Sequence, residues 1–326
     1  MINKTYPNVN NFCGGNFQDW LEVNLLKECN GRCSWCIEKN GFHPETSANW
    51  KIIADQAILT GKKNIILLGG EPTLYPYLKE IIQYLNNANL SVWITTNGSR
   101  LSPNFIRKNL VGIKGINISI HSWDLSQNEE ITGVKIKNLL SSIKTLKEMN
   151  ISIRFNCNCI AGYIDNYHRI EDYILLAKSL GVTKVRFAEL KQDDESFVDL
   201  AKILNYRYGL NDDPFVCGCN KNAVIHEVDV NFRQMCGLQT SQRKKPYNPV
   251  QFAKQVLYYD GKIYNGWQTK ESQMNSVHTK VLSILKAVEN GKMTSEEALV
   301  KIFSSMDNQI SLKHIENVNT GAGCQY

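Results

Sequence analysis

The sequence alternates between two hydrophobic periods from about residue 20 to residue 190, and this rhythm restricts the fold more than any other feature. Short runs rich in β-branched residues predict strands at Trp20–Leu26, Asn64–Leu68, Leu90–Thr95, Gly115–Ile120, Ile151–Ile160 and Val182–Leu190. Apolar residues spaced i, i+3 and i+4 predict helices near residues 45–60, 76–88, 101–110, 136–149 and 166–180. Such alternation implies parallel strands joined by right-handed crossovers. The pattern therefore predicts an α/β fold, a partial (βα)6 TIM-like barrel, with a doubly wound open sheet as the alternative.

After residue 190 the rhythm changes and predicts a different kind of structure. Residues 192–220 are more polar, and the later elements expected are two strands with a turn at Asp260-Gly261 and two short helices: Ala223–Met235, Val256–Ile263, Lys280–Asn290 and Ser295–Met306. We therefore divide the chain into an N-terminal segment (1–19), the barrel (20–190) and a small α+β C-terminal extension (191–326).

Composition and charge narrow the class of protein. The chain has 326 residues, of which 43% are hydrophobic and 21% charged, as in ordinary globular proteins. Residues Met1 to Phe12 are polar and lack a basic region followed by an apolar core, and no apolar run is long enough to span a bilayer. We expect a cytoplasmic protein without a membrane partner. The net charge of +6 suits an anionic ligand but is too small and too evenly spread to predict duplex nucleic-acid binding.

Ten cysteines are the strongest compositional signal. In a chain of this size without a secretory signal, clustered cysteines are more often metal ligands or catalytic groups than disulfides. Cys29, Cys33 and Cys36 stand in one short loop directly after the first predicted strand. Three thiolates can bind three irons of a cubane cluster and leave the fourth iron open to a small molecule. A zinc site completed by His43 is the alternative.

The spacing Cys-x3-Cys-x2-Cys, with Trp35 before the last cysteine, resembles the signature of the radical S-adenosylmethionine (SAM) superfamily. The resemblance implies an oxygen-sensitive [4Fe-4S] cluster on the three cysteines and SAM bound at the open iron. It also implies reductive cleavage of SAM to a 5′-deoxyadenosyl radical that abstracts hydrogen from a substrate. An electron donor such as flavodoxin or ferredoxin is implied as well. The cofactor would supply the difficult chemistry, and the protein orientation and seclusion.

Further segments follow in the order that the resemblance requires. The resemblance implies that Gly69-Gly70-Glu71-Pro72 contacts the methionyl amine of SAM, and that Thr96 and Asn97 lie near its methionyl and ribose groups. It implies further that Ser119 contacts the ribose or the carboxylate, and that Arg154 contacts the carboxylate. Leu190 would lie beside the adenine, and Trp35 would also contact SAM. Taken alone, glycines in such a turn let backbone approach a ligand closely, and a buried arginine needs an anion. His121 is a candidate catalytic residue facing the substrate, with a purely structural role as the alternative.

Within the superfamily, the order of these motifs is similar to the branch that holds the molybdenum-cofactor GTP cyclase and the SPASM/twitch-domain enzymes. The similarity covers roughly residues 20–190. The cyclase's C-terminal cysteine spacing and glycine-rich tail are not matched, because this chain ends Gly321-Ala322-Gly323-Cys324-Gln325-Tyr326.

A second group of cysteines flanks a predicted hairpin from Val224 to Met235. Auxiliary-cluster domains of this branch place cysteines similarly, so a second Fe-S cluster is one reading of Cys217, Cys219 and Cys236, with Cys324 as a further ligand. A structural zinc that uses His226 and free or redox-active thiols are the other readings. Cys157 and Cys159 share one face of a strand, and we assign both to structure.

Three functions stay open at this point. The leading hypothesis is a radical enzyme acting on a small molecule that is a nucleoside, nucleotide or sugar-like compound, since little chain precedes Trp20 for a leader-peptide-binding domain. The hairpin cysteines favour the second, a radical enzyme that matures a ribosomally made short peptide. The third, from another class, is a non-catalytic zinc or thiol protein.

Overall fold

The computed structural model of the protein describes residues 19–190, 194–205, 207–210, 220–235, 255–267, 284–285 and 287–307. These residues fall into two compact units. The larger unit comprises residues 19–38 and the described residues between 43 and 266, and the smaller comprises 39–42 with the described residues from 267 onward. The smaller unit contains α10 (Ser295–Asp307), in agreement with the helix predicted at Ser295–Met306.

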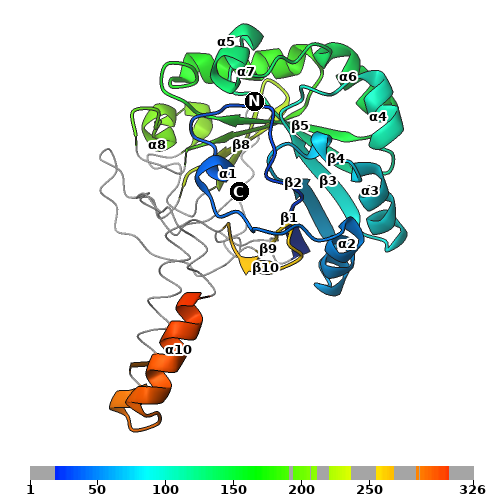
Figure 1. The fold of residues 1–326 in the computed structure, drawn as a ribbon. Helices are drawn as coiled ribbons and strands as arrows, with labels where there is room; N and C mark the ends of the chain where they lie inside the picture. The colour runs from blue at the N-terminus through cyan, green and yellow to red at the C-terminus, as the bar shows by residue number, and fades with distance from the viewer. Residues whose placement is uncertain are drawn as a thin grey trace. The chain divides into compact units, whose positions relative to one another are not determined.

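Six parallel strands form the centre of the larger unit, and helices lie outside them (Figure 1). The strands are β1 (Trp20–Asn24), β2 (Asn64–Leu68), β3 (Ser91–Thr96), β4 (Gly115–Ser119), β5 (Ser152–Asn158) and β6 (Lys184–Ala188). The intervening helices are α2 (Trp50–Leu59), α3 (Leu78–Asn87), α4 (Pro103–Asn109), α5 (Leu125–Thr132), α6 (Leu139–Glu148) and α7 (Tyr167–Ser179). Neighbouring strands pair in sequence order, which confirms the predicted partial barrel.

Two hairpins from the C-terminal third extend the same sheet. They are β7 (Asn220–Ile225) with β8 (Val228–Arg233), and β9 (Gln255–Leu257) with β10 (Ile263–Asn265). β8 pairs in parallel with β6, and β9 pairs in parallel with β1, so the order is β10-β9-β1-β2-β3-β4-β5-β6-β8-β7. In the part of the chain that the structure describes, β10 and β7 are the two ends of the sheet, and the barrel is open.

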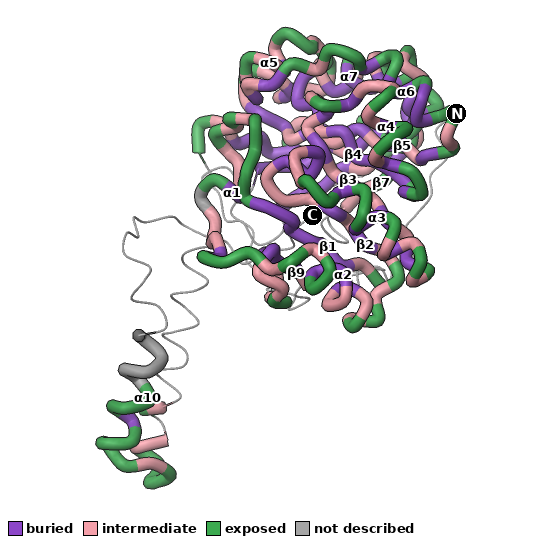
Figure 2. Tube along the Cα trace, turned by 45° about the vertical axis from the view of Figure 1, so that its right-hand side comes forward, coloured by how far each residue is buried: buried purple, intermediate pink, exposed green. Residues whose placement is uncertain are grey.

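Side-chain alternation on the strands explains where the core lies. In β2, β3 and β5, buried apolar residues alternate with partly buried ones, as expected for strands whose two faces meet different surroundings (Figure 2). Ile65 and Leu67 are fully buried, and so are Ile81, Ile82 and Leu85 of α3. The packed core therefore lies between the sheet and its helices, while the other face of the strands is available for polar groups.

Capping residues begin most of the helices at the carboxyl ends of the strands. Asn49, Ser102, Asp124 and Asn166 each accept a hydrogen bond from a backbone N–H in the first turn of α2, α4, α5 and α7. Each cap satisfies a backbone donor that the helix itself leaves unpaired.

The elements that the sequence did not predict are short. α1 (Ile37–Asn40), α5 and α8 (Leu200–Leu204) were not expected, nor were the short 3-10 helices η2 (Pro72–Leu74) and η3 (Arg207–Gly209). The run Ala223–Met235, expected as one strand or as a hairpin, contains the turn between β7 and β8, where His226 and Glu227 adopt positive φ values of 51° and 66°. Part of the helix expected at Lys280–Asn290 lies outside the described residues.

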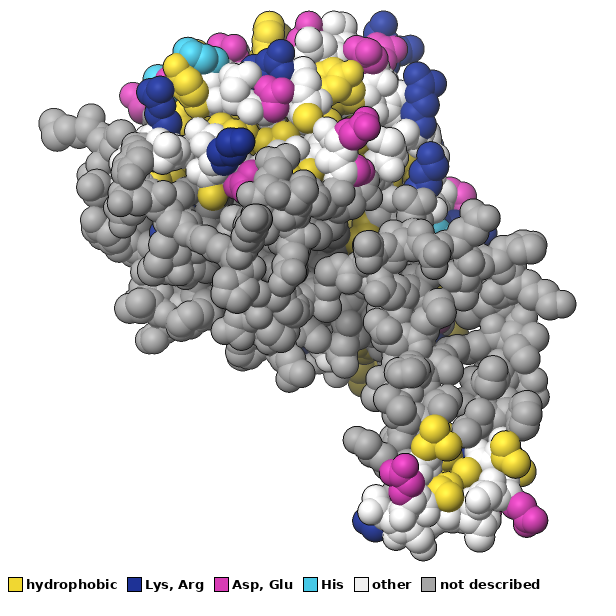
Figure 3. All heavy atoms as spheres, turned by 90° about the vertical axis from the view of Figure 1, so that its left-hand side faces the viewer, with side chains coloured by type: hydrophobic (Ala, Val, Ile, Leu, Met, Phe, Trp, Pro, Cys, Tyr) yellow, Lys and Arg dark blue, Asp and Glu magenta, His cyan; other side chains and the backbone are white. Residues whose placement is uncertain are grey.

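The surface is of mixed charge on the face in Figure 3, where Lys and Arg side chains of the larger unit lie among Asp and Glu side chains. Among the described helices, none has the length and apolar character needed to cross a bilayer.

Candidate active site

The three clustered cysteines lie in the loop that follows β1, at the carboxyl end of the strands. Backbone pairing with β2 continues one residue past β1, where Leu25 donates to the carbonyl of Leu68 at 2.9 Å. Cys29 is exposed, whereas Cys33 and Cys36 are partly buried, and Cys36 directly precedes α1. In parallel α/β sheets, ligands bind at this edge.

The glycine pair after β2 contacts the backbone of the cysteine loop. Gly70 N donates to Leu26 O at 2.7 Å, and Glu71 N donates to Glu28 O at 2.8 Å. A Cβ on Gly70 would lie 2.1 Å from the oxygen of Glu28, and a Cβ on Gly69, whose φ is +144°, would lie 2.6 Å from the oxygen of Leu26. These glycines are thus required because two backbones meet there, which the sequence alone did not indicate.

The carboxylate of Glu71 is a buried junction between two strand-end loops. Its Oε1 accepts from Thr73 N at 3.0 Å, Thr73 Oγ1 at 2.6 Å and Thr96 Oγ1 at 2.6 Å, and its Oε2 accepts from Asn97 N at 2.8 Å. Burial raises the pKa of Glu71 above its ordinary value, while these hydrogen bonds act in the opposite direction. Glu71 therefore joins the ends of β2 and β3 beneath the cysteine loop.

Asn97 extends that junction to the first cysteine. Its Oδ1 accepts from Ser99 N and Ser99 Oγ at 3.0 and 2.6 Å, and its Nδ2 donates to Asn30 Oδ1 at 2.9 Å and lies 4.0 Å from Cys29 Sγ. Gly31 N also donates to Cys29 Sγ, at 3.2 Å. Hydrogen bonds to a ligating sulfur help set the potential of an iron–sulfur centre.

The pKa of the Cys29 thiol is raised above its ordinary value. Although the residue as a whole is exposed, partial desolvation of the sulfur is the main cause and the charge of Glu71 adds to it, while the hydrogen bonds from Gly31 N and Asn97 Nδ2 act in the opposite direction. A cationic iron centre would invert this balance, because a coordinating thiol is deprotonated by the metal.

His121 lies at the end of β4 as a buried, neutral ring. Its Nδ1 accepts from Asn158 N at 3.0 Å, so the ring proton is on Nε2. Burial lowers the pKa of His121 to about 4. The ring packs edge-on against Trp35, with centroids 5.5 Å apart and planes at 87°. His121 thus touches the cysteine loop itself.

This buried ring predicts a loss of stability in acid. Between pH 4 and 6.5 the unfolded chain binds a proton at His121 and the folded chain does not, so the stability due to neutral His121 is complete above 6.5 and falls as the pH drops. Relative to His121→Gln, which does not titrate, we expect the wild type to lose about 2 kcal/mol of unfolding free energy between pH 7 and pH 5. Denaturant unfolding at pH 7 and pH 5 measures this loss. An equal change of unfolding free energy in the wild type and in His121→Gln would contradict the conclusion that His121 is buried and neutral.

Ser119 and Arg154 face the same side of the sheet at neighbouring strands. Ser119 ends β4 and is in register with Asn156 of β5, and Arg154 Nε donates to Asn156 Oδ1 at 3.0 Å. Burial, and secondarily the charge of Arg233, lower the pKa of Arg154 to about 10. Sequence reasoning missed Arg233, which is 1% exposed at the end of β8. Its position is visible only once β8 is known to pair with β6.

Trp35 and Leu190, predicted on separate segments, belong to one small apolar cluster apart from the main core. Its buried members are Ile160, Leu190 and Phe197, with Trp35, Ile131 and Tyr163 packed against them. The cluster joins the cysteine loop to the loops after β5 and β6.

Glu189 is a second buried carboxylate, to which sequence reasoning assigned no role in the site. Its Oε1 accepts from Leu200 N at 3.0 Å, and its Oε2 accepts from Met235 N at 2.7 Å. It fastens the end of β6 to the start of α8 and to the end of β8. The sequence signal that could have indicated this role is the acidic residue within the largely apolar run from Val185 to Leu190.

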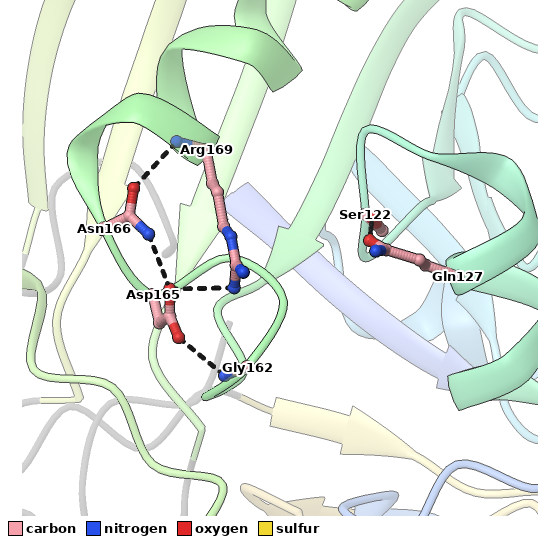
Figure 4. Close-up of polar contacts among 6 residues, drawn as sticks. All are labelled: Ser122, Gln127, Gly162, Asp165, Asn166 and Arg169. Atoms are coloured by element: carbon pink, nitrogen blue, oxygen red, sulfur yellow. Dashed lines mark hydrogen bonds and ion pairs between the residues drawn. The ribbon is translucent and has the colours of Figure 1, made fainter.

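Polar contacts also fix the loops after β4 and β5 (Figure 4). Asp165 accepts from Gly162 N at 2.7 Å, from Asn166 Nδ2 at 2.9 Å and from Arg169 Nη1 at 3.1 Å, while Ser122 Oγ donates to Gln127 Oε1 at 2.7 Å. Hydrogen bonds between residues close in sequence therefore stabilise the conformation of these two loops.

Three thiolates on one loop are the metal-binding donors at this edge of the sheet. Within the described residues, no group of three or more His, Cys, Asp and Glu side chains is arranged to hold a single metal ion. A cubane differs because each thiolate binds a separate iron. The three cysteines on one loop, with backbone glycines beneath it, fit such a group. The second group, Cys217, Cys219, Cys236 and Cys324, lies outside the described residues.

The chain is similar in sequence and in fold to known proteins. The model of the Radical SAM superfamily matches residues 23–177. GTP 3′,8-cyclase of Aquifex aeolicus is 30% identical over 184 residues, which cover 52% of this chain and 55% of that protein. The mitochondrial GTP 3′,8-cyclase of Arabidopsis thaliana is 27% identical over 202 residues, which cover 59% and 51%. The chain thus spans about half the length of the curated relatives it matches.

Solved structures show the same fold. Streptococcus suis SuiB bound to precursor peptide SuiA has a TM-score of 0.54 and 16% identity, covering 76% of this chain and 59% of that one. The anSMEcpe protein with bound AdoMet and Cp18Cys peptide has a TM-score of 0.53 and 12% identity, covering 76% of each chain. With the cysteine loop and the strand-end motifs lying in the matched region, residues 23–177 form a domain of the radical SAM superfamily.

Proposed function

We propose that the protein is a radical SAM enzyme acting on a small nucleoside-, nucleotide- or sugar-like molecule. The observation that carries the proposal is the loop of Cys29, Cys33 and Cys36 at the carboxyl end of six parallel strands. Cys29, Cys33 and Cys36 would hold a [4Fe-4S] cluster, which when reduced would supply the electron for cleavage of SAM to methionine and a 5′-deoxyadenosyl radical that would take a hydrogen atom from the substrate.

The chain's own residues would bind and orient SAM. We assign Gly69–Pro72 to the methionyl amine, where Glu71, 1% exposed, acts chiefly by holding the segment in place. Ser119 and Arg154 would take the ribose and carboxylate, with Asn156 orienting the guanidinium. Thr96 and Asn97 would lie near the methionyl and ribose groups.

Apolar residues would bind the adenine and exclude water from it. Leu190 and Trp35 share the small apolar cluster described above, which offers a surface for an aromatic ring. Seclusion of this kind protects a reactive radical from solvent.

The substrate class rests on sequence relatives and on the charge of the strand faces. The matched relatives are GTP 3′,8-cyclases, by name enzymes of a nucleotide. Arg154 and Arg233, close enough that the charge of Arg233 lowers the pKa of Arg154, place two cationic groups among the strands, and such groups suit an anionic molecule. We also propose a cytoplasmic location, an external electron donor of the flavodoxin or ferredoxin type, and a second cluster on the cysteines after residue 216.

The test is SAM cleavage by the anaerobically reconstituted, reduced protein. We expect 5′-deoxyadenosine from the wild type and none from Cys33→Ala, because a two-thiolate loop cannot hold the cluster with one open iron. Cys159→Ala, which removes a buried thiol outside the loop, is the matched control and should retain cleavage. Full activity in Cys33→Ala, or stoichiometric zinc and no iron in the wild type, would refute the proposal.

A further inference from the structure

α5 buries polar rather than apolar side chains, which is unusual for a helix on the outside of a barrel. Its buried residues are Asn128 and Thr132, 2% and 3% exposed and one turn apart. Most surface helices bury an apolar stripe. Ile131 of α5 packs against the small apolar cluster, but the two most buried side chains, Asn128 and Thr132, must be stabilised by hydrogen bonds, and the partners in those bonds show what the helix holds.

Asn128 ties α5 to the end of β4. Its Oδ1 accepts from the backbone N–H of His121 at 2.7 Å. His121 in turn accepts from Asn158 N through Nδ1, so β4, β5 and α5 are joined through one residue.

Thr132 continues the connection to the cysteine loop. Its Oγ1 donates to Asn128 O at 2.6 Å and accepts from Val134 N at 3.2 Å, while its carbonyl accepts from Arg32 N at 2.7 Å. Arg32 lies between Cys29 and Cys33. A continuous set of hydrogen bonds thus runs from β5 to the middle of that loop.

Two glycines allow the backbones to meet on both sides of Arg32. A Cβ on Gly133, the α5 C-cap with φ +70°, would lie 2.4 Å from Arg32 Cγ. A Cβ on Gly31 would lie 3.3 Å from Val134 Cγ2 and 3.4 Å from both Thr132 O and Cys29 Sγ. The end of α5 therefore packs directly against the segment that links the first two cysteines.

We propose that α5 is a bracket that sets the position of the Cys29–Cys33 segment, with Asn128 and Thr132 as its positioning residues. The inference rests on the proposed function, because it concerns the same loop. Loops are the most mobile parts of a fold, and a reactive centre must be held within fractions of an ångström. Gly70 and Glu71 fix the start of the loop, and α5 fixes its centre.

The experiment uses Asn128→Leu, which removes the acceptor at similar size, and Thr132→Val, which removes only the hydroxyl. We expect both reconstituted proteins to bind iron but to show a broadened electron paramagnetic resonance spectrum of the reduced cluster. The KM for SAM should rise about five- to tenfold, the loss expected for one hydrogen bond, with a smaller change in kcat. Asn128→Asp, which keeps Oδ1, should restore much of the wild-type spectrum.

Thr145→Val in α6 is the matched control. Thr145 is 4% exposed and its hydroxyl donates to the carbonyl four residues earlier, at 3.0 Å, as that of Thr132 does. Thr145→Val should lower the free energy of unfolding as Thr132→Val does. It should leave the electron paramagnetic resonance spectrum of the cluster and the KM for SAM unchanged.

Wild-type spectrum and KM in both α5 variants, or equal changes in Thr145→Val, would overturn the bracket. If Asn128→Leu does not fold, Thr132→Val carries the test alone. Absence of the cluster signal or of SAM cleavage in the wild type would instead sink the proposed function, which separates the two failures.

Discussion

Gly70→Ala is expected to reduce iron incorporation by about tenfold or more while the barrel stays folded. The added methyl carbon would lie 2.1 Å from the oxygen and 2.5 Å from the carbonyl carbon of Glu28, and 2.6 Å from the oxygen of Lys27. These are backbone atoms of the cysteine loop, so no side chain can rotate away. The loop must shift, and three thiolates on one loop then no longer share a geometry that a cubane accepts.

The measurement is iron per chain after anaerobic reconstitution, with about four expected for one cluster in the wild type. Gly61→Ala is the matched control, because Gly61, which follows α2, has no atom within 4 Å of an added Cβ. Its positive φ of 69° makes alanine cost about 1 kcal/mol of stability without changing iron content. Wild-type iron content in Gly70→Ala would show that the loop is not held as described.

Glu71→Ala should lower the free energy of unfolding by about 3 kcal/mol or more. The substitution leaves the N–H groups of Thr73 and Asn97 without their carboxylate acceptor in a site where Glu71 is 1% exposed. An unsatisfied buried donor costs its full desolvation penalty. The free energy of unfolding of Glu71→Gln should lie between those of the wild type and Glu71→Ala. Its amide oxygen still accepts hydrogen bonds, but its NH2 group faces donors that the second carboxylate oxygen of Glu71 accepts from.

Denaturant unfolding of the variants provides the measurement, with Glu148→Ala as control. Glu148 also accepts a short bond, from Arg107 at 2.6 Å, but both side chains are about half exposed, at 45% and 55%. Surface pairs of this kind contribute about 1 kcal/mol or less. Equal losses in Glu71→Ala and Glu148→Ala would show that the junction beneath the cysteine loop does not stabilise the fold.

The strands of the barrel could be predicted because their signal is local. β2 was predicted with both ends correct, and β3, β4 and β6 within two residues at each end, since runs of β-branched residues and flanking helices mark them in the sequence. The position of the cysteine loop followed from the same pattern, because parallel strands bring all their carboxyl ends to one edge.

α5 could not be predicted because its burial does not follow apolar spacing. The sequence from Leu125 to Thr132 has few apolar residues, and the buried ones are Asn128 and Thr132. The same reason hid the role of Glu71: a carboxylate after a glycine pair was expected to meet a ligand, but it is satisfied by the protein's own donors. Networks of this kind depend on three-dimensional neighbours.

The C-terminal hairpins illustrate the other limit. The turn at Asp260-Gly261 had a local signal, but nothing local indicates that β8 pairs with β6 and β9 with β1. Which distant strands pair depends on how their buried faces fit the rest of the sheet, and this is not encoded in the local sequence. The extension therefore belongs, for its described strands, to the same sheet as the barrel.

The pairing of β9 with β1 has a consequence for the order of events during synthesis. Val256 and Leu257 are among the last described residues of the sheet to be made, yet they border Glu22 and Val23, which are among the first. Translation proceeds at about 5–20 residues per second, so β1 exists for many seconds with one edge uncovered. The strand that leads into Cys29 is complete only when almost the whole sheet has left the ribosome. A cluster at Cys29 would therefore have the complete sheet beneath it only after the residues of β9 have been made.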